Sequence, residues 1–193
     1  TPTIGGVGFI KNLNDMITKD LKEVGSYIIV VGKTLGHLHQ SELFRVVLEI
    51  TDGQPPEINL FNEKSNGLII QRLISNKLVR SVHDISAGGI LVTLSEMCIS
   101  GKIGAKIEIP RVNISSYEYL FSEDQSRYVV EVNEKNKDEV CKILEKNSVY
   151  YEIIGKTQKD NLDLDKEFKI KLTDLSELNS FWFKDYFKED HES

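Results

Sequence analysis

Residues 81–90 read Ser-Val-His-Asp-Ile-Ser-Ala-Gly-Gly-Ile, and residues 120–127 read Leu-Phe-Ser-Glu-Asp-Gln-Ser-Arg. Each stretch places a polar turn against an apolar segment that is predicted to be a β-strand, residues 78–82 before the first turn and residues 128–132 after the second. Side chains at the ends of strands are held on a rigid edge. The two polar turns, called the first and second corner below, therefore predict one composite site at the edge of a sheet.

The first corner offers groups that suit an anionic ligand. Asp84 and Ser86 carry side-chain oxygens, and Gly88 and Gly89 leave the backbone amides open to close approach. Amides at the start of a helix carry partial positive charge, which favours phosphate. We therefore predict that these four residues contact a phosphorylated substrate or a nucleotide. Asp84 has two further interpretations, as a Mg²⁺ ligand and as the N-cap of the helix that follows.

The second corner combines a carboxylate, an amide and a guanidinium, from Glu123, Gln125 and Arg127. This mixture suits a ligand with phosphate and hydrogen-bonding groups, so we predict that all three side chains contact it. The alternative is that Glu123 and Arg127 form an ion pair that braces the strand. His83 is either an acid–base group or a hydrogen-bonded structural residue. No Ser/His/Asp or Cys/His pairing has supporting context, which argues against covalent catalysis by this chain.

The composition indicates one globular domain, residues 1–193. The chain is 40% hydrophobic and carries a formal charge of −6, from 30 acidic and 24 basic residues. No basic block or stripe occurs, which argues against nucleic acid as a partner. No apolar run approaches ~18 residues, so no membrane span is expected. Cys98 and Cys141 lie in apolar helical patterns, which predicts core thiols in a reducing cytoplasm rather than a disulfide.

The spacing of apolar residues predicts both strands and helices. Strands are expected near residues 7–10, 27–31, 79–82, 105–109, 128–132, 151–154 and 168–172. Helices are expected at residues 41–48, 62–76, 87–100 and 136–146. Because strands and helices do not alternate strictly, the pattern indicates an α+β fold with α/β/α layers around a mixed sheet. The aromatic segment 181–187 is expected to pack on this sheet or on a missing neighbour.

The ordered set of motifs resembles a known family. Both corners are similar to turns in the C-terminal domain of the aminoimidazole ribonucleotide synthase superfamily, and the expected layered fold is the fold of that domain. Within the superfamily, the chain most resembles the phosphoribosylformylglycinamidine synthase family, whose last domain is entered through a run similar to residues 1–8, Thr-Pro-Thr-Ile-Gly-Gly-Val-Gly. The resemblance extends to about residue 155. One departure lies in the second corner, where Asp124 replaces a serine that is usual in the family.

The resemblance implies an ATP-dependent ligase of purine biosynthesis. Enzymes of this family convert formylglycinamide ribonucleotide to formylglycinamidine ribonucleotide. ATP phosphorylates the amide oxygen of the substrate, and ammonia derived from glutamine displaces the phosphate. The implied cofactors of the parent chain are ATP and Mg²⁺, and none is expected to stay tightly bound to this segment. The implied partners are the preceding ATP-binding domain of the same chain and a glutaminase domain or subunit.

The resemblance also implies that this segment is one part of a larger enzyme. The residues credited with catalysis in the family lie in preceding domains, and the sequence starts with Thr1, so we expect a C-terminal domain that is inactive alone and self-associates. The half that it resembles is auxiliary in the family, which makes Asp84 either a metal ligand or a remnant. Two alternatives are another enzyme of the same superfamily and a non-catalytic structural assembly module.

Overall fold

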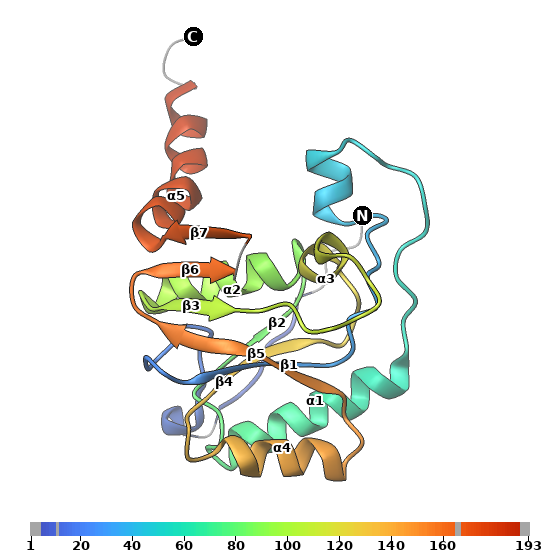
Figure 1. Ribbon diagram of the computed structural model, residues 1–193, viewed down its shortest axis with the longest axis vertical. Helices are drawn as coiled ribbons and strands as arrows, with labels where there is room; N and C mark the ends of the chain where they lie inside the picture. Colours follow the sequence, from blue (N-terminus) through green and yellow to red (C-terminus); the bar gives the residue numbers. More distant parts are fainter. Residues whose placement is uncertain (1–4, 11, 165–166, 190–193) are drawn as a thin grey trace.

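A computed structural model describes residues 5–10, 12–164 and 167–189 (Figure 1). Its strands are β1 (Tyr27–Val31), β2 (Ser81–Asp84), β3 (Gly104–Ile107), β4 (Tyr128–Val132), β5 (Tyr151–Gln158), β6 (Asn161–Leu164) and β7 (Phe168–Lys171). Its helices are α1 (Leu60–Ser75), α2 (Gly89–Gly101), α3 (Ser116–Phe121), α4 (Lys137–Lys146) and α5 (Leu172–Glu189), with a 3₁₀ turn η1 (Leu13–Asp15) and a π-helical turn η2 (Leu43–Val47). No described helix is long and apolar enough to cross a membrane.

The strands form one mixed sheet in the order β2-β4-β1-β5-β3-β6-β7. Among the described strands, β3 and β6 pair in parallel and the other neighbours pair antiparallel. The two strands that border the corners, β2 and β4, are neighbours, with His83 opposite Val129 and Asp84 opposite Tyr128. This pairing brings the end of β2 to the start of β4, so the two corners meet at one end of the sheet.

Helices cover both faces of the sheet, which confirms the predicted α+β fold with α/β/α layers (Figure 1). The central strand β1 shows the reason. Its side chains alternate between the faces, so that Ile28 and Val30 pack in the core with α2 and α3, whereas Ile29 and Val31 pack in the core with α1 and α4. All four of these side chains are fully buried.

Most predicted elements are present, with three differences. The strand expected near residues 7–10 is wrong, because residues 5–10 form no strand and Val7 and Phe9 are exposed. The predicted helix at residues 41–48 is the short π-helical turn η2. Four further elements, η1, β6, α3 and α5, were not predicted from the sequence.

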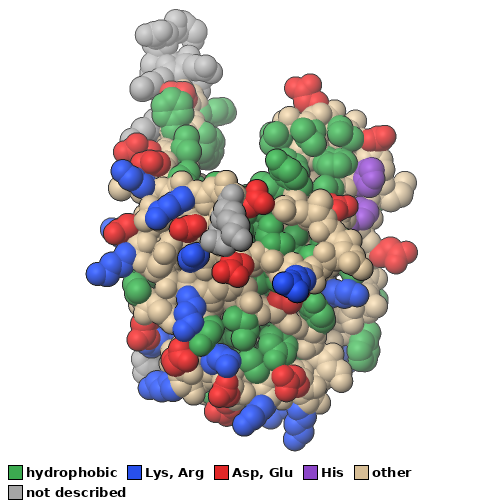
Figure 2. Space-filling model, in the orientation of Figure 1, with side chains coloured by type: hydrophobic (Ala, Val, Ile, Leu, Met, Phe, Trp, Pro, Cys, Tyr) green, Lys and Arg blue, Asp and Glu red, His purple; other side chains and the backbone are tan. Residues whose placement is uncertain are grey.

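Helix α5 leaves the body of the domain and carries most of the C-terminal aromatic side chains into solvent (Figures 1 and 2). Its first turn packs on the core through Leu172 and Leu175. The exposed side chains, with exposed fractions between 50% and 66%, are Leu178, Phe181, Trp182, Phe183, Tyr186 and Phe187. The expectation that the aromatic segment packs on its own sheet is therefore wrong, and packing on a neighbour stays a prediction.

Candidate functional site

The first corner connects β2 to α2 and lies against the second corner. The backbone nitrogen of Ile85 donates to the carbonyl oxygen of Arg127 at 2.9 Å. The N-cap of α2 is Gly88, in the left-handed region at φ 81°, and this residue has no side chain with which to cap the helix. The interpretation of Asp84 as the N-cap is therefore wrong, and the side chain of Asp84 is left exposed at the end of β2.

Both glycines of the first corner have positive φ, and Gly89 in addition lies against the backbone of the second corner. Gly89 has φ 69°, and a Cβ atom on it would lie 2.6 Å from the carbonyl oxygen of Leu120 and 2.7 Å from that of Ser122. No residue larger than glycine fits this contact without a shift. The amide of Gly89 donates to the carbonyl oxygen of Ser86 at 3.1 Å. The glycine pair thus docks the start of α2 against the second corner.

Glu123 ties three segments together. Its Oε1 atom accepts hydrogen bonds from the backbone nitrogens of Gly88, at 2.8 Å, and Glu42, at 2.7 Å. Its own backbone nitrogen donates to the carbonyl oxygen of His37 at 3.2 Å. The Glu123 carboxylate therefore accepts the hydrogen bond of the Gly88 amide. This amide was predicted from the sequence to bind a phosphate.

Asp124, beside it, is nearly buried at 3% exposure and accepts three backbone hydrogen bonds. Leu35 and Gly36 donate to Oδ2 at 2.8 and 3.0 Å, and His37 donates to Oδ1 at 3.3 Å. Gly36 has φ 86°, a conformation that lets successive N–H groups converge on one anion. The sequence identified Asp124 only as a replacement for a serine that is usual in the family, because its partners lie 87 to 89 positions away.

Arg127 is a structural residue of the second corner, with 1% exposure. Its guanidinium donates to the carbonyl oxygens of Asp124 and Ser122, at 3.0 and 2.6 Å, and to Oγ1 of Thr34 at 3.1 Å. Burial lowers the pKa of this guanidinium, and the nearby Asp124 carboxylate opposes that shift. Because the donors face these oxygens rather than the Glu123 carboxylate, the predicted ion pair between Glu123 and Arg127 is wrong.

A cavity of about 370 Å³ lies between the two corners. Asp84 and Ser86 line it from the first corner, and Glu123, Gln125 and Arg127 line it from the second. The structure thus brings five of the seven predicted ligand-contacting residues to one cavity, while the two glycines are outside its lining. The two corners therefore meet at one cavity, as the composite site requires, and ligand binding there stays a prediction.

The described residues do not form a magnesium site on their own. The Asp84 side chain is 68% exposed, and its Oδ1 atom lies 3.2 Å from Nδ1 of His83. The other ring nitrogen of His83, Nε2, lies 2.7 Å from Oε2 of Glu96, so this histidine is held in a polar contact on each side. Mg²⁺ needs about six oxygen ligands. No group of three His, Cys, Asp or Glu side chains within the described ranges is arranged to hold a metal.

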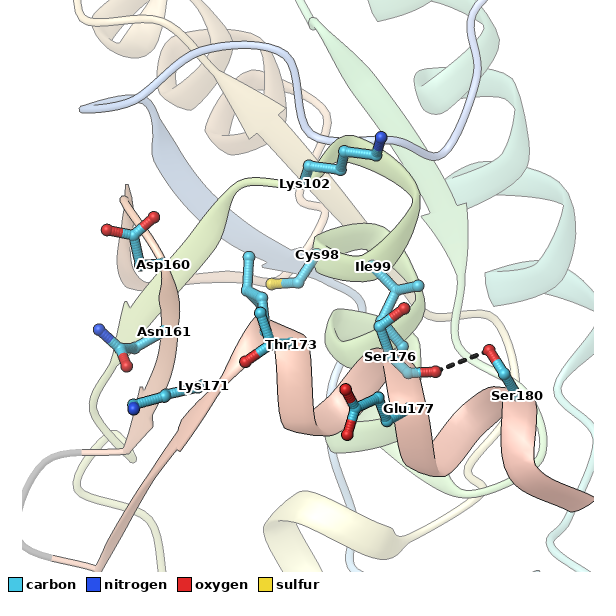
Figure 3. A pocket seen from close by; sticks show the side chains of 11 residues that line it. Cys98, Ile99, Lys102, Asp160, Asn161, Lys171, Thr173, Ser176, Glu177 and Ser180 are labelled. Atoms are coloured by element: carbon cyan, nitrogen blue, oxygen red, sulfur yellow. Dashed lines mark hydrogen bonds between the residues drawn. The ribbon is translucent and has the colours of Figure 1, made fainter.

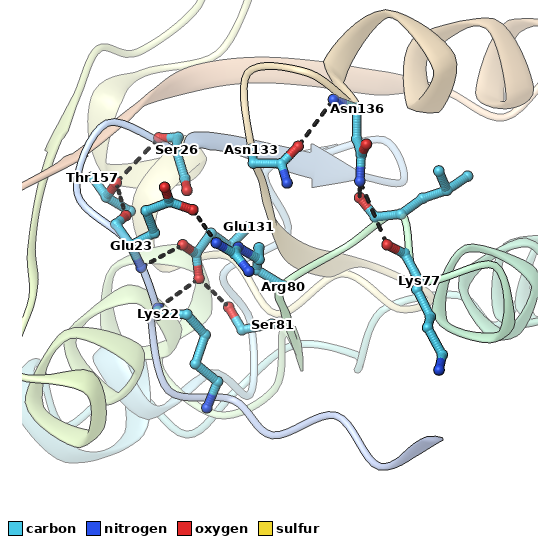
Figure 4. Close-up of polar contacts among 11 residues, drawn as sticks. Lys22, Glu23, Ser26, Lys77, Arg80, Ser81, Glu131, Asn133, Asn136 and Thr157 are labelled. Carbon is cyan, nitrogen blue, oxygen red and sulfur yellow. Dashed lines mark hydrogen bonds and ion pairs between the residues drawn. The ribbon is translucent and has the colours of Figure 1, made fainter. Parts of the chain in front are cut away.

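A buried carboxylate fixes β2, from which Asp84 extends (Figure 4). Glu131, on β4, is 0% exposed and was not identified from the sequence. It accepts hydrogen bonds from the backbone nitrogens of Lys22 and Glu23, at 2.8 and 3.0 Å, and from Oγ of Ser81 at 3.1 Å. These contacts hold β2 and the segment before β1 against β4, so the strand that carries the first corner has little freedom to move.

A cavity of about 810 Å³ lies away from the corners, between the end of α2 and the start of α5 (Figure 3). Cys98 is among the side chains that line it, together with Lys102, Thr173 and Glu177. Burial raises the pKa of the Cys98 thiol to about 12, so the nucleophilic thiolate is scarce at neutral pH. Both cysteines are free and buried, which confirms their prediction as core thiols.

Comparison with known sequences places most of the chain in one family. Residues 23–165 match the model of the family described as AIR synthase related protein, C-terminal domain. Phosphoribosylformylglycinamidine synthase subunit PurL of Pelagibacter ubique is 46% identical over 186 residues, which cover 96% of this chain and 26% of that protein. The chain therefore spans about a quarter of the length of this curated relative.

Solved structures share the fold. PurL of Thermotoga maritima complexed with FGAR superposes with a TM-score of 0.70 at 18% identity, over 85% of this chain and 30% of the other. The structure of PurLQS from Thermotoga maritima superposes with a TM-score of 0.68 at 20% identity, over 85% of this chain and 28% of the other. The family model covers most of the sheet and both corners. The chain therefore belongs to the family described as AIR synthase related protein, C-terminal domain.

Proposed function

We propose that this chain is the C-terminal domain of an ATP-dependent ligase that converts formylglycinamide ribonucleotide to formylglycinamidine ribonucleotide in purine biosynthesis. The observation that carries the proposal is the 46% identity to a PurL subunit along 96% of the chain. The cavity between the corners supports it, because carboxylate, hydroxyl and amide side chains from two elements converge there. The catalytic residues belong to the part of the enzyme that corresponds to the other three quarters of the P. ubique protein.

Within that enzyme, the exposed side chains of the cavity contact the ligand and the buried ones hold the wall. Asp84, Ser86 and Gln125 are exposed and line the cavity, where their polar groups reach hydroxyl or amide groups of the ligand. Glu123 and Arg127 act by keeping the two corners together. Asp84 is one ligand of a Mg²⁺ ion whose other ligands come from outside this chain.

The partners follow from the same assignment. An ATP-binding domain of the same chain packs against this domain, and a glutaminase domain or subunit supplies ammonia. The assembly named PurLQS, in which the T. maritima relative occurs, supports a multi-subunit arrangement. Two buried, unpaired cysteines are consistent with a reducing cytoplasm as the compartment.

A domain-replacement experiment tests the proposal. The matching quarter of P. ubique PurL is replaced by this chain, and the chimera is expressed in a bacterium that lacks its own PurL. We expect growth without added purine. A soluble chimera that fails to support growth, while the unmodified P. ubique protein succeeds, contradicts the proposal. A chimera in which Ala replaces Asp84, Ser86 and Gln125 but which still supports full growth favours the structural assembly module.

A further inference from the structure

The backbone amides that could bind an anion at the corners are already used by the protein. Asp124 accepts from the amides of residues 35–37, and Glu123 accepts from those of Glu42 and Gly88. Two consecutive carboxylates thus satisfy five N–H groups that come from the loop before η2 and from the start of α2. In other proteins such converging amides bind phosphate. Here the anion is covalently part of the chain.

We propose that Asp124 and Glu123 act as internal anions that fill this amide cradle, so that the corners exclude phosphate. The cradle is defined as the backbone N–H groups of residues 35–37, Glu42 and Gly88. The uncharged hydroxyl or amide part of a ligand then enters the cavity between the corners, and any phosphate group lies elsewhere. This inference concerns the corners themselves and holds whatever reaction the parent enzyme catalyses.

The charges around the cavity support exclusion. Glu63, Asp84 and Glu123 bring three carboxylates to its lining, and Arg127 is the cation among the lining residues. Arg127 is 1% exposed, and its guanidinium donates hydrogen bonds to three protein oxygens. A phosphate in this cavity, on the Glu123 side of the cradle, would therefore meet negative charge without a free cationic side chain. Asp124 and residues 35–37 line a neighbouring cavity of about 420 Å³, together with Lys33.

The geometry makes Asp124 the stronger of the two internal anions. It is 3% exposed and uses both carboxylate oxygens, whereas Glu123 is partly exposed and uses Oε1. An anion that is linked to the chain occupies its cradle without the entropy cost of binding from solution. Free phosphate can compete only when the carboxylate is removed.

The test removes the internal anion and offers inorganic phosphate in its place. The Asp124→Ser variant of the 193-residue chain is unfolded in urea at increasing phosphate, with sodium chloride at matched ionic strength as the salt control. We expect the variant to be less stable than wild type and to be rescued by phosphate. Each tenfold rise in phosphate above its dissociation constant should increase the folding equilibrium constant of the variant about tenfold. Wild type should show no such rise.

Asp84→Ser is the matched control, because it removes a nearby carboxylate, in the cavity between the corners, whose recorded contact is with the His83 side chain and not with a backbone amide. It should lose little stability and gain none from phosphate. The inference is overturned if phosphate stabilises wild type as strongly as Asp124→Ser, or if Asp124→Ser is as stable as Asp84→Ser.

A second measurement decides the question even if Asp124→Ser does not fold. The backbone amide resonances of residues 35–37 and Gly88 in wild type are followed by NMR during a phosphate titration. Unchanged resonances support internal occupation. Saturable shifts confined to these amides show that phosphate reaches the cradle and overturn the proposal.

Discussion

The Oε1 atom of Glu123 lies 2.8 Å from the backbone nitrogen of Gly88, so a side chain of the second corner holds the amide at the start of α2. The same oxygen lies 2.7 Å from the backbone nitrogen of Glu42. One carboxylate therefore joins the loop before η2, the first corner and the second corner. The composite site is built by this contact between segments, which are separated by 35 and 81 residues.

Truncation of Glu123 should loosen both corners. Glu123→Ala leaves two backbone N–H groups without their acceptor, and we expect the free energy of unfolding to fall by about 2–3 kcal/mol. Glu123→Gln keeps an acceptor oxygen and should lose less. Urea unfolding measures both, with Glu57→Ala, at an exposed loop carboxylate, as the control. Equal stability of Glu123→Ala and Glu57→Ala would show that the contact is not a stabilising one.

Gly89→Ala should be more destabilising than its backbone conformation alone explains. The added Cβ would meet the carbonyl oxygen of Leu120 at 2.6 Å, and Gly89 has φ 69°. Gly25 is the matched control, because it has φ 91° but nothing within 4 Å of the added Cβ. We expect Gly25→Ala to cost about 1 kcal/mol and Gly89→Ala about 1–3 kcal/mol more. Two equal losses in urea unfolding would mean that the contact with the second corner relaxes freely.

Acid should remove the stabilising contribution of Glu96. Hydrogen bonds from His83, at 2.7 Å, and then from Lys19, at 2.8 Å, lower the pKa of Glu96 below its ordinary value of 4.5. A carboxylate with a lowered pKa stabilises the folded state above its unfolded pKa and loses this effect as the pH falls through the folded pKa. The stability difference between wild type and Glu96→Gln should therefore shrink as the pH falls below 4.5.

The control for this titration is Glu57→Gln, at an exposed loop carboxylate. Midpoints of urea unfolding at several pH values provide the comparison. A difference for Glu96→Gln that is independent of pH would mean that the two hydrogen bonds do not favour the charged carboxylate.

The exposed aromatic face of α5 should cause self-association of the isolated chain. Phe181, Trp182, Phe183, Tyr186 and Phe187 are each at least 50% exposed, and contiguous apolar patches of this kind commonly mark interfaces. We expect sedimentation coefficients that rise with protein concentration, and a Trp182→Lys variant that remains monomeric. Monomeric wild type at high concentration would contradict this prediction.

The elements with clear apolar periodicity could be predicted from the sequence, and those that depend on distant partners could not. Strand β4 has the predicted bounds, because its apolar run is flanked by polar turns. Strand β6 reads Asn-Leu-Asp-Leu and resembles a polar loop until its parallel pairing with β3 buries Leu162 and Leu164. The segment at residues 7–10 shows the opposite case, since its apolar residues have no strand partner within the described chain.

The residues of the site could be predicted more readily than their partners. Corner residues Asp84, Ser86, Glu123 and Gln125 reach one cavity as expected, because strand ends hold them at the same edge. The roles of the acidic side chains depend on backbone N–H donors that only folding brings close to their carboxylates. Sequence spacing therefore could not reveal that Glu123 binds Gly88, nor that Asp124 binds the amides near Gly36.

The most direct measurement of the central claim is ADP release by the purified chimera of this chain with the rest of P. ubique PurL. The account predicts turnover that requires both formylglycinamide ribonucleotide and ammonium, at a rate typical of enzymes, ~1–10³ s⁻¹. It also predicts no turnover by the 193-residue chain alone. A folded chimera that releases no ADP in response to formylglycinamide ribonucleotide, or an isolated chain that turns it over, would contradict the assignment of this chain as one domain of that ligase.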